Sequence, residues 1–128
     1  MIAPVLIQVP GSPEYVSTIR AVTRSVCALA DLAADDVEEL QIAVDEAATL
    51  LLPLIDAAGH GRLEARFTVE SGHLGVTLCV QTASSGADVD RSGMAWIMLT
   101  GLDPDVRVDR DGSDLSITIR RARSHAVQ

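Results

Sequence analysis

Few side chains in this sequence combine a reactive type with a spacing that supports catalysis or metal binding. Cys27 and Cys79 are isolated, without a C-x-x-C pair, so we expect two free and unreactive thiols. The histidines also lack the spacing of metal ligands; they are His60, His73 and His125. The absence of lysine and of asparagine excludes any chemistry that needs either side chain.

Two neighbouring carboxylates, Asp45 and Glu46, lie within a pattern typical of a helix. Ile42, Glu46 and Leu50 recur at a spacing of four residues, which places them on one helical face. Two of these three residues are apolar, so the face is either an extension of the core or an apolar groove for a ligand or partner. An isolated glutamate is costly in a dry core, so we expect Glu46 at a rim or paired with an arginine.

The composition is that of one small acidic domain over residues 1–128. The chain is 48% hydrophobic and carries 18 acidic residues against 10 arginines, for a net charge of −8. At this size folding buries about two-thirds of the surface of the unfolded chain, so a core forms without disulfides or metals. The negative charge opposes direct binding to nucleic acid and to anionic membranes. With no evident signal sequence or membrane-spanning segment, we expect a cytoplasmic protein.

The elements that position the carboxylates follow from hydrophobic periodicity. Alternating apolar residues predict a first strand and then two hairpins, with strands over residues 4–9, 63–69, 74–80, 106–108 and 115–119. Spacings of three and four predict helices over residues 13–31, 35–55 and 94–102. Pro53 predicts a kink or end of the second helix near Leu52, with Gly59 and Gly61 closing that segment.

The predicted strands are apolar on one face only. The opposite face is polar, with Glu64, Arg66, Thr68, Arg107, Asp109, Thr118 and Arg120. Helices that cover only the apolar face of a mixed or mostly antiparallel sheet form a two-layer α/β sandwich. That is the fold class we expect.

The segment that carries Glu46 resembles a known motif. Residues 39–50 read ELQIAVDEAATL, which resembles the N-box, usually E-x-x-x-N, of the GHKL ATPases in their branch of RsbW-type anti-sigma factors. Residues 15–20, YVSTIR, resemble the arginine-bearing first helix of that branch. The order of the predicted elements also matches over nearly the whole chain. The resemblance implies the two-layer fold of the histidine-kinase-like ATPase (HATPase) domain.

The resemblance also assigns roles to residues and exposes departures from the family pattern. In the family the N-box asparagine helps to hold magnesium on the nucleotide, and the glutamate four residues earlier is the general base. Here Glu46 occupies the general-base position, but Leu50 replaces the asparagine and offers no oxygen to a hard cation. The adenine-binding box, D-x-G-x-G, corresponds to TASSG, where Thr82 and Ser84 replace family residues and only Gly86 remains.

A second glycine box of the family corresponds to Gly93 and the helix after it, with Trp96 where an aliphatic residue is usual. Because the match to this box is incomplete, the sequence gives little support for phosphate contact through backbone amides at the start of this helix. We expect no catalytic residue, metal or required cofactor. The residual nucleotide-binding positions are Glu46, Leu50, Thr82, Gly86 and Gly93. ATP and magnesium are the cofactors if the pocket works in another geometry, with Asp45 or Glu46 holding the metal.

The first helix carries the candidate partner surface. By resemblance Arg20 corresponds to the arginine that contacts both the sigma factor and the antagonist protein, and its donor fork suits a carboxylate on a partner. Its helical neighbours Val16, Thr23 and Arg24 would share that interface. The alternative is a solvent-exposed arginine without a partner role.

Two functions of different class follow. The first is an anti-sigma factor that sequesters an alternative sigma factor, is countered by a STAS-type anti-anti-sigma protein, and forms a homodimer as its family does. It would lack kinase turnover, because phosphoryl transfer depends on the metal and on positioning, and its acidity suits a basic client. The second is an active ATP-dependent serine protein kinase that phosphorylates its STAS partner, with Glu46 as the base. A scaffold of a partner-switching complex is a third possibility.

Overall fold

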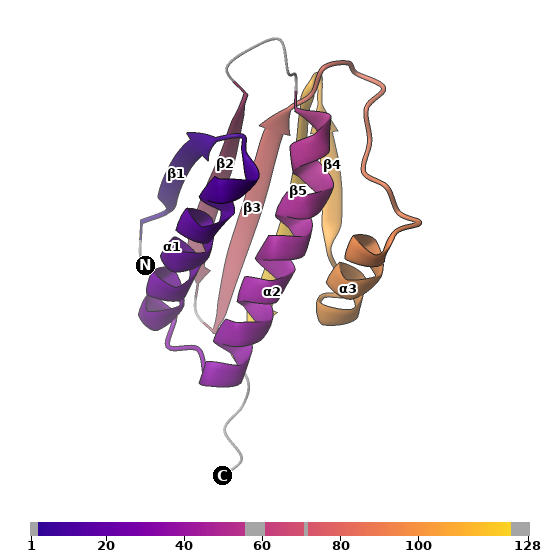
Figure 1. The fold of residues 1–128 in the computed structure, drawn as a ribbon. Helices are drawn as coiled ribbons and strands as arrows, with labels where there is room; N and C mark the ends of the chain where they lie inside the picture. The colour runs from indigo at the N-terminus through magenta and orange to yellow at the C-terminus, as the bar shows by residue number, and fades with distance from the viewer. Residues whose placement is uncertain (1–2, 56–60, 71, 124–128) are drawn as a thin grey trace.

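The computed structural model describes residues 3–55, 61–70 and 72–123 (Figure 1). The strands are β1 (Val5–Pro10), β2 (Arg62–Glu70), β3 (His73–Gln81), β4 (Arg107–Asp111) and β5 (Asp114–Ala122). The helices are α1 (Val16–Leu29), α2 (Ala34–Leu51) and α3 (Met94–Leu102). None of the helices in these ranges is long and apolar enough to span a membrane.

The strands form one sheet in the order β1-β2-β3-β5-β4. All three helices lie on the same face of this sheet, with α2 between α1 and α3 (Figure 1). The expected two-layer α/β sandwich is therefore confirmed. Of the mixed and mostly antiparallel arrangements that we expected, the antiparallel one is observed, because every pairing among the described strands is antiparallel.

The core lies between the sheet and the helices, where the alternating apolar residues meet across the strands. Phe67 of β2 is opposite Val76 of β3, which is in turn opposite Ile119 of β5. Each of these side chains is at most 1% exposed. The strand register thus aligns the apolar positions of all three strands toward the helices, as their period of two requires.

Two prolines determine where α1 begins and where α2 ends. The segment Pro13–Tyr15 forms one 3-10 turn, and α1 begins only at Val16. α2 ends at Leu51 because Pro53 has no N–H to continue the helical bonds, and Leu52–Leu54 make a second 3-10 turn. The prediction that placed Ile55 on the helical stripe is therefore wrong: Ile55 forms a β-bridge with Thr82. Gly59 lies outside the described residues.

A largely buried ion pair joins the sheet to the helical layer. Arg121 of β5 donates from Nε to Asp36 Oδ1 of α2 at 3.1 Å and from Nη1 to the carbonyl of Leu102 at 3.2 Å. Its Nη2 also pairs with Glu39. The Asp36 side chain is 3% exposed and that of Arg121 is 23% exposed. One arginine therefore ties β5 to α2 and to the end of α3.

Both cysteines are free, and burial suppresses the ionisation of their thiols. Burial of Cys27 raises its thiol pKa from 9.0 to about 11. The unfolded thiol ionises more readily, so the contribution of Cys27 to the free energy of unfolding should be constant up to about pH 9 and fall as the pH rises toward 11. Urea denaturation across this interval measures the effect. Cys27→Ala should make the curve flatter, and a wild-type curve that rises with pH would contradict the prediction.

Candidate functional site

The apolar face of α2 that carries Glu46 runs from the rim of the fold into its core. Ile42 and Glu46 are half-buried, whereas Leu50 is 7% exposed and belongs to the core. Among the described residues Glu46 forms no ion pair, so the predicted arginine partner is absent there. Of the two positions that we expected for Glu46, the rim is the one observed. Leu50 extends the core at the position that corresponds to the N-box asparagine.

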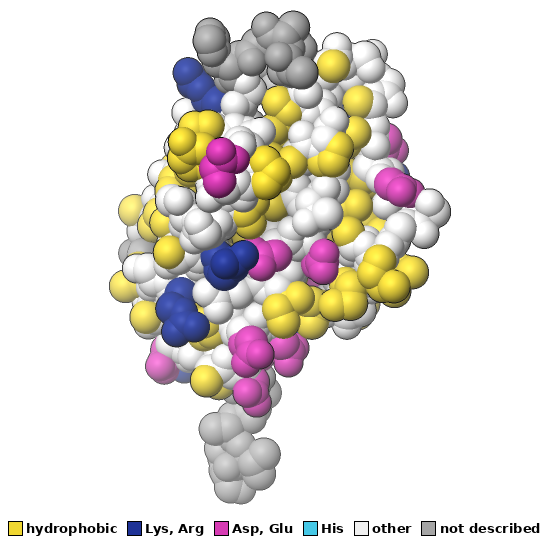
Figure 2. All heavy atoms as spheres, viewed as in Figure 1, with side chains coloured by type: hydrophobic (Ala, Val, Ile, Leu, Met, Phe, Trp, Pro, Cys, Tyr) yellow, Lys and Arg dark blue, Asp and Glu magenta, His cyan; other side chains and the backbone are white. Residues whose placement is uncertain are grey.

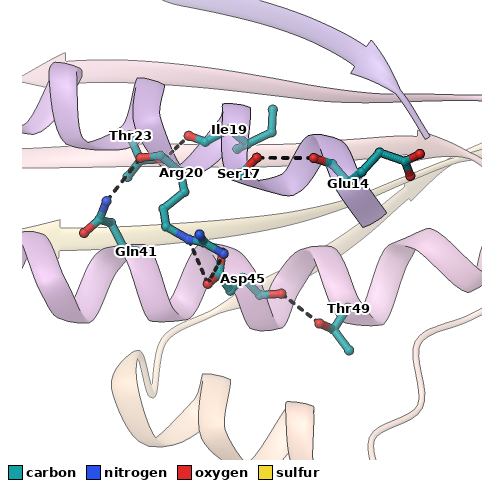
Figure 3. Close-up of polar contacts among 8 residues, drawn as sticks. All are labelled: Glu14, Ser17, Ile19, Arg20, Thr23, Gln41, Asp45 and Thr49. Atoms are coloured by element: carbon teal, nitrogen blue, oxygen red, sulfur yellow. Dashed lines mark hydrogen bonds and ion pairs between the residues drawn. The ribbon is translucent and has the colours of Figure 1, made fainter. Parts of the chain in front are cut away.

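Asp45, next to Glu46, is the counterion of Arg20 (Figure 3). Arg20 donates from Nε to both Asp45 oxygens, at 3.2 and 3.1 Å, and its Nη2 lies 3.0 Å from Oδ2. Gln41 Nε2 donates to the Arg20 carbonyl at 3.2 Å, and Thr49 donates its hydroxyl to the Asp45 carbonyl at 2.9 Å. Asp45 is thus engaged between α1 and α2, which makes it a poor candidate for a metal ligand.

The predicted partner surface on α1 is smaller than its helical spacing suggested. Arg20 and Arg24 are exposed and Val16 is half-buried. Thr23 is 0% exposed, and its hydroxyl donates to the Ile19 carbonyl at 2.8 Å. Thr23 therefore belongs to the buried stripe of α1 and is removed from the partner surface. The Arg20 side chain remains 45% exposed despite its ion pair, so part of its guanidinium is accessible to a second carboxylate.

Thr82, at the position that corresponds to the adenine-binding aspartate, is held by protein groups. It is 4% exposed, and its hydroxyl lies 2.8 Å from the Ser84 carbonyl and 2.9 Å from the Ser113 carbonyl. The same oxygen accepts from Arg110 Nη1 at 3.5 Å. Because the single hydroxyl proton is donated to one or the other of these carbonyls, Thr82 is poorly placed to recognise a base. Sequence reasoning missed Arg110 and Ser113, which flank a turn remote in sequence from Thr82.

The two glycine positions differ in their surroundings. Gly86 is exposed, and a Cβ there would meet nothing within 4 Å, so packing does not require a glycine. At Gly93, the N-cap of α3, a Cβ would lie 3.3 Å from Asp90 Oδ2. Hydrogen bonds from the hydroxyl and N–H of Ser92 lower the pKa of Asp90. An ionised carboxylate beside the start of α3 opposes the binding of a phosphate at that helix end.

Comparison of the sequence with protein-family models identifies the family of this chain. The model of the "Histidine kinase-like ATPase domain" family matches residues 9–121, which is most of the chain. The chain belongs to the histidine kinase-like ATPase family. No curated protein shows significant sequence similarity to it.

Solved structures share the fold of this histidine kinase-like ATPase chain at low identity. The crystal structure of the RsbU and RsbW domains of Rv1364c from Mycobacterium tuberculosis is similar with a TM-score of 0.69 and 15% identity, over 98% of this chain and 35% of that one. The histidine kinase domain of a blue-light activated histidine kinase from Erythrobacter litoralis EL346 has a TM-score of 0.58 and 17% identity, over 88% of this chain and 60% of that one. The chain thus spans only part of each.

Membership of the histidine kinase-like ATPase family implies ATP and Mg²⁺ as possible ligands of this site. Magnesium requires oxygen ligands in near-octahedral geometry. Within the described ranges no group of three or more His, Cys, Asp and Glu side chains has an arrangement that holds a metal. Leu50 supplies no oxygen and Asp45 is bound to Arg20. Within the part of the chain that the structure describes, Glu46 is the one carboxylate of the α2 motif without an ion pair, so the donor set there does not fit magnesium-ATP as the family motif would hold it.

Proposed function

We propose that this chain is a cytoplasmic anti-sigma factor that binds and sequesters an alternative sigma factor without kinase turnover. A STAS-type anti-anti-sigma partner counters it, and the chain acts as a homodimer. The observation that carries the proposal is the burial of Leu50 in the core of a histidine kinase-like ATPase fold. The structural similarity to a protein that contains an RsbW domain supports the partner-switching role.

The donor set supports a binding role over a catalytic one. Phosphoryl transfer depends on metal neutralisation and positioning of the phosphates. Leu50 is apolar, the Thr82 hydroxyl is directed at two carbonyls, and Asp45 is paired with Arg20. Without phosphorylation of the antagonist, release of the sigma factor depends on competition between partners, which mass action sets through their concentrations and affinities.

The charge of the chain supports a basic client. The net charge is −8, and α2 carries six acidic residues and no basic one. A negative surface accelerates encounter with a positive partner and competes with its binding to DNA. Arg20 and Arg24 provide a local positive region on α1, which suits a carboxylate on the same client or on the antagonist.

Arg20 is testable as a partner contact because its intramolecular counterion can be removed separately. Arg20→Ala should weaken binding of the sigma factor encoded nearest to this chain by about tenfold or more. Asp45→Asn should preserve or strengthen binding, because it frees the guanidinium without deleting it. Arg107→Ala, at another exposed arginine with an acidic neighbour, is the matched control and should have no effect. Calorimetry and inhibition of transcription in vitro measure these outcomes, and failure to bind or inhibit any such sigma factor contradicts the proposal.

A second candidate is the active serine protein kinase, which the half-buried Glu46 favours because the described part of the chain gives it no ion pair. Titration with magnesium-ATP separates the two candidates. The anti-sigma factor without turnover gives no saturable heat and no phosphate on a STAS partner. Tight binding with phosphate transfer to a partner serine, abolished by Glu46→Gln, would establish the kinase instead.

A further inference from the structure

α3 exposes large apolar side chains that the fold does not cover. Met94 is 70% exposed, Ile97 is 59% exposed and Met98 is 42% exposed. In Figure 2 hydrophobic side chains gather over α3, at the lower right of the view. The sequence of this helix, MAWIMLTGL, contains no charged residue, and Leu99 is its one fully buried side chain. Contiguous exposed apolar area on a protein of this size marks an interaction site more often than a single exposed residue does.

The exposed residues form one continuous stripe. Met94, Ile97, Met98 and Gly101 follow the spacing of three, four and seven that puts residues on one helical face; these four residues are called the α3 surface below. Gly101 is exposed, and a Cβ there would meet nothing within 4 Å. The other face of the helix packs on the core through Leu99 and Leu102. The α3 surface is therefore apolar along its length. At Gly101 no side chain projects from the helix, so the backbone of another chain can approach closely.

Exposed acidic residues flank α3 on both sides in the sequence. Asp88 and Asp90 precede α3 and Asp105 follows it, and all three are exposed. Hydrogen bonds from Arg91 and Ser92 lower the pKa values of Asp88 and Asp90 respectively, so both stay ionised. The neighbouring helix α2, against which α3 packs, contains six acidic residues, of which Asp36 and Glu39 pair with Arg121 and Asp45 pairs with Arg20.

The arginine nearest to α3 in the sequence, Arg91, already forms an ion pair. Arg91 pairs with Asp88 at 2.9 Å, and its guanidinium carbon lies 5.2 Å from the centre of the Trp96 ring. This pair partly neutralises both Arg91 and Asp88, so the negative charge next to the α3 surface comes chiefly from Asp90 and Asp105.

We propose that the α3 surface is the docking site for a basic amphipathic helix of a partner protein. The apolar face of that helix covers Met94, Ile97 and Met98, and its lysine or arginine side chains reach the acids that flank α3. Helices pack by fitting the side-chain ridge of one between the ridges of the other, so an apolar ridge at helical spacing suits the apolar face of another helix. Flexible methionine side chains adapt to the partner's shape. A second copy of the chain, also with net charge −8, and an anionic membrane both lack the complementary charge.

This surface does not depend on the proposed anti-sigma function. It follows from the exposure and charge around α3, which is separated from the α1 surface of Arg20 by α2 (Figure 1). A test with synthetic peptides keeps the two proposals distinct, because it uses neither a sigma factor nor an antagonist.

The test titrates the full chain, labelled with nitrogen-15, with an amphipathic peptide of leucine and lysine about 20 residues long. Backbone NMR shifts should change at the α3 surface and in the flanking acidic segments. Ile97→Ser should weaken binding about tenfold or more, and Gly101→Arg should weaken it by adding bulk and positive charge to the stripe. Leu29→Ser, at a residue of α1 that is 55% exposed, is the matched control and should leave the affinity unchanged. Binding should also weaken as salt rises from about 0.05 to about 0.3 M.

Other outcomes overturn the inference. They include equal binding of a leucine and glutamate peptide, shifts centred on Leu29 instead of α3, and no binding of either peptide. Sedimentation that detects a dimer abolished by Ile97→Ser would assign the surface to a second copy of the chain. Binding to phosphatidylcholine vesicles that Ile97→Ser abolishes would assign it to a membrane.

Discussion

Replacing Arg121 with methionine is expected to lower the free energy of unfolding by roughly 3–5 kcal/mol, because it removes the arginine that pairs with the buried carboxylate of Asp36. The Asp36 side chain is 3% exposed and accepts a hydrogen bond from Arg121 Nε. The substitution also removes the donor to the Leu102 carbonyl, which loosens the contact of β5 with the end of α3. Methionine fills most of the same space, so the loss reports charge pairing more than packing. Urea denaturation of the purified variant gives the value.

The controls for Arg121 use charges of the same chain in different surroundings. Arg123 pairs with Asp31 at 3.2 Å, but Asp31 is 88% exposed. Arg123→Met should therefore cost no more than about 1 kcal/mol, as for other surface pairs. The double variant Arg121→Met with Asp36→Asn should be less destabilised than the sum of the two single variants, because it removes both charges of the pair. Equal losses for Arg121→Met and Arg123→Met would show that burial of Asp36 is not the cause.

Leu50→Asn, which restores the N-box residue of the family, is expected to destabilise the chain without creating a magnesium-nucleotide site. Leu50 is 7% exposed and packs in the core. The variant loses apolar burial and places an amide where its hydrogen bonds are unmet, which together should cost roughly 2–5 kcal/mol. Nucleotide binding should remain absent, because Thr82 and Asp45 keep their present partners. Urea denaturation and titration with magnesium-ATP measure the two effects.

Thr49→Asn is the matched control for Leu50→Asn. It introduces the same side chain one position earlier, where the residue is exposed. Its effect on stability should stay within about 0.5 kcal/mol, as is usual for surface substitutions. If Leu50→Asn instead bound magnesium-ATP tightly and kept wild-type stability, the interpretation of Leu50 as a core residue would be wrong.

The predicted elements agree with the structure where local chemistry is decisive. The helix over residues 94–102 has the predicted bounds, and both hairpins lie where alternating residues and turns place them. Errors arose where position depended on distant contacts. The stripe extended to Ile55 because periodicity does not reveal that this residue bridges to Thr82. The spacing of Thr23 from Arg20 predicts that it shares the partner surface, whereas the apolar periodicity of α1 places it on the stripe with Ile19. Packing of α1 on the sheet buries Thr23 with that stripe.

The sequence by itself determined the layers of this protein and its helical face with Glu46, because periodicity and residue type are local properties. Its resemblance to the N-box also predicts that Leu50 stands at the position of the asparagine that helps to hold magnesium. Tertiary structure alone decided the state of each candidate residue. It placed Leu50 in the core, bound Asp45 to Arg20, and directed the Thr82 hydroxyl at the Ser113 carbonyl. These contacts join residues far apart in the chain, so their geometry depends on how the helices pack on the sheet, which no local pattern encodes.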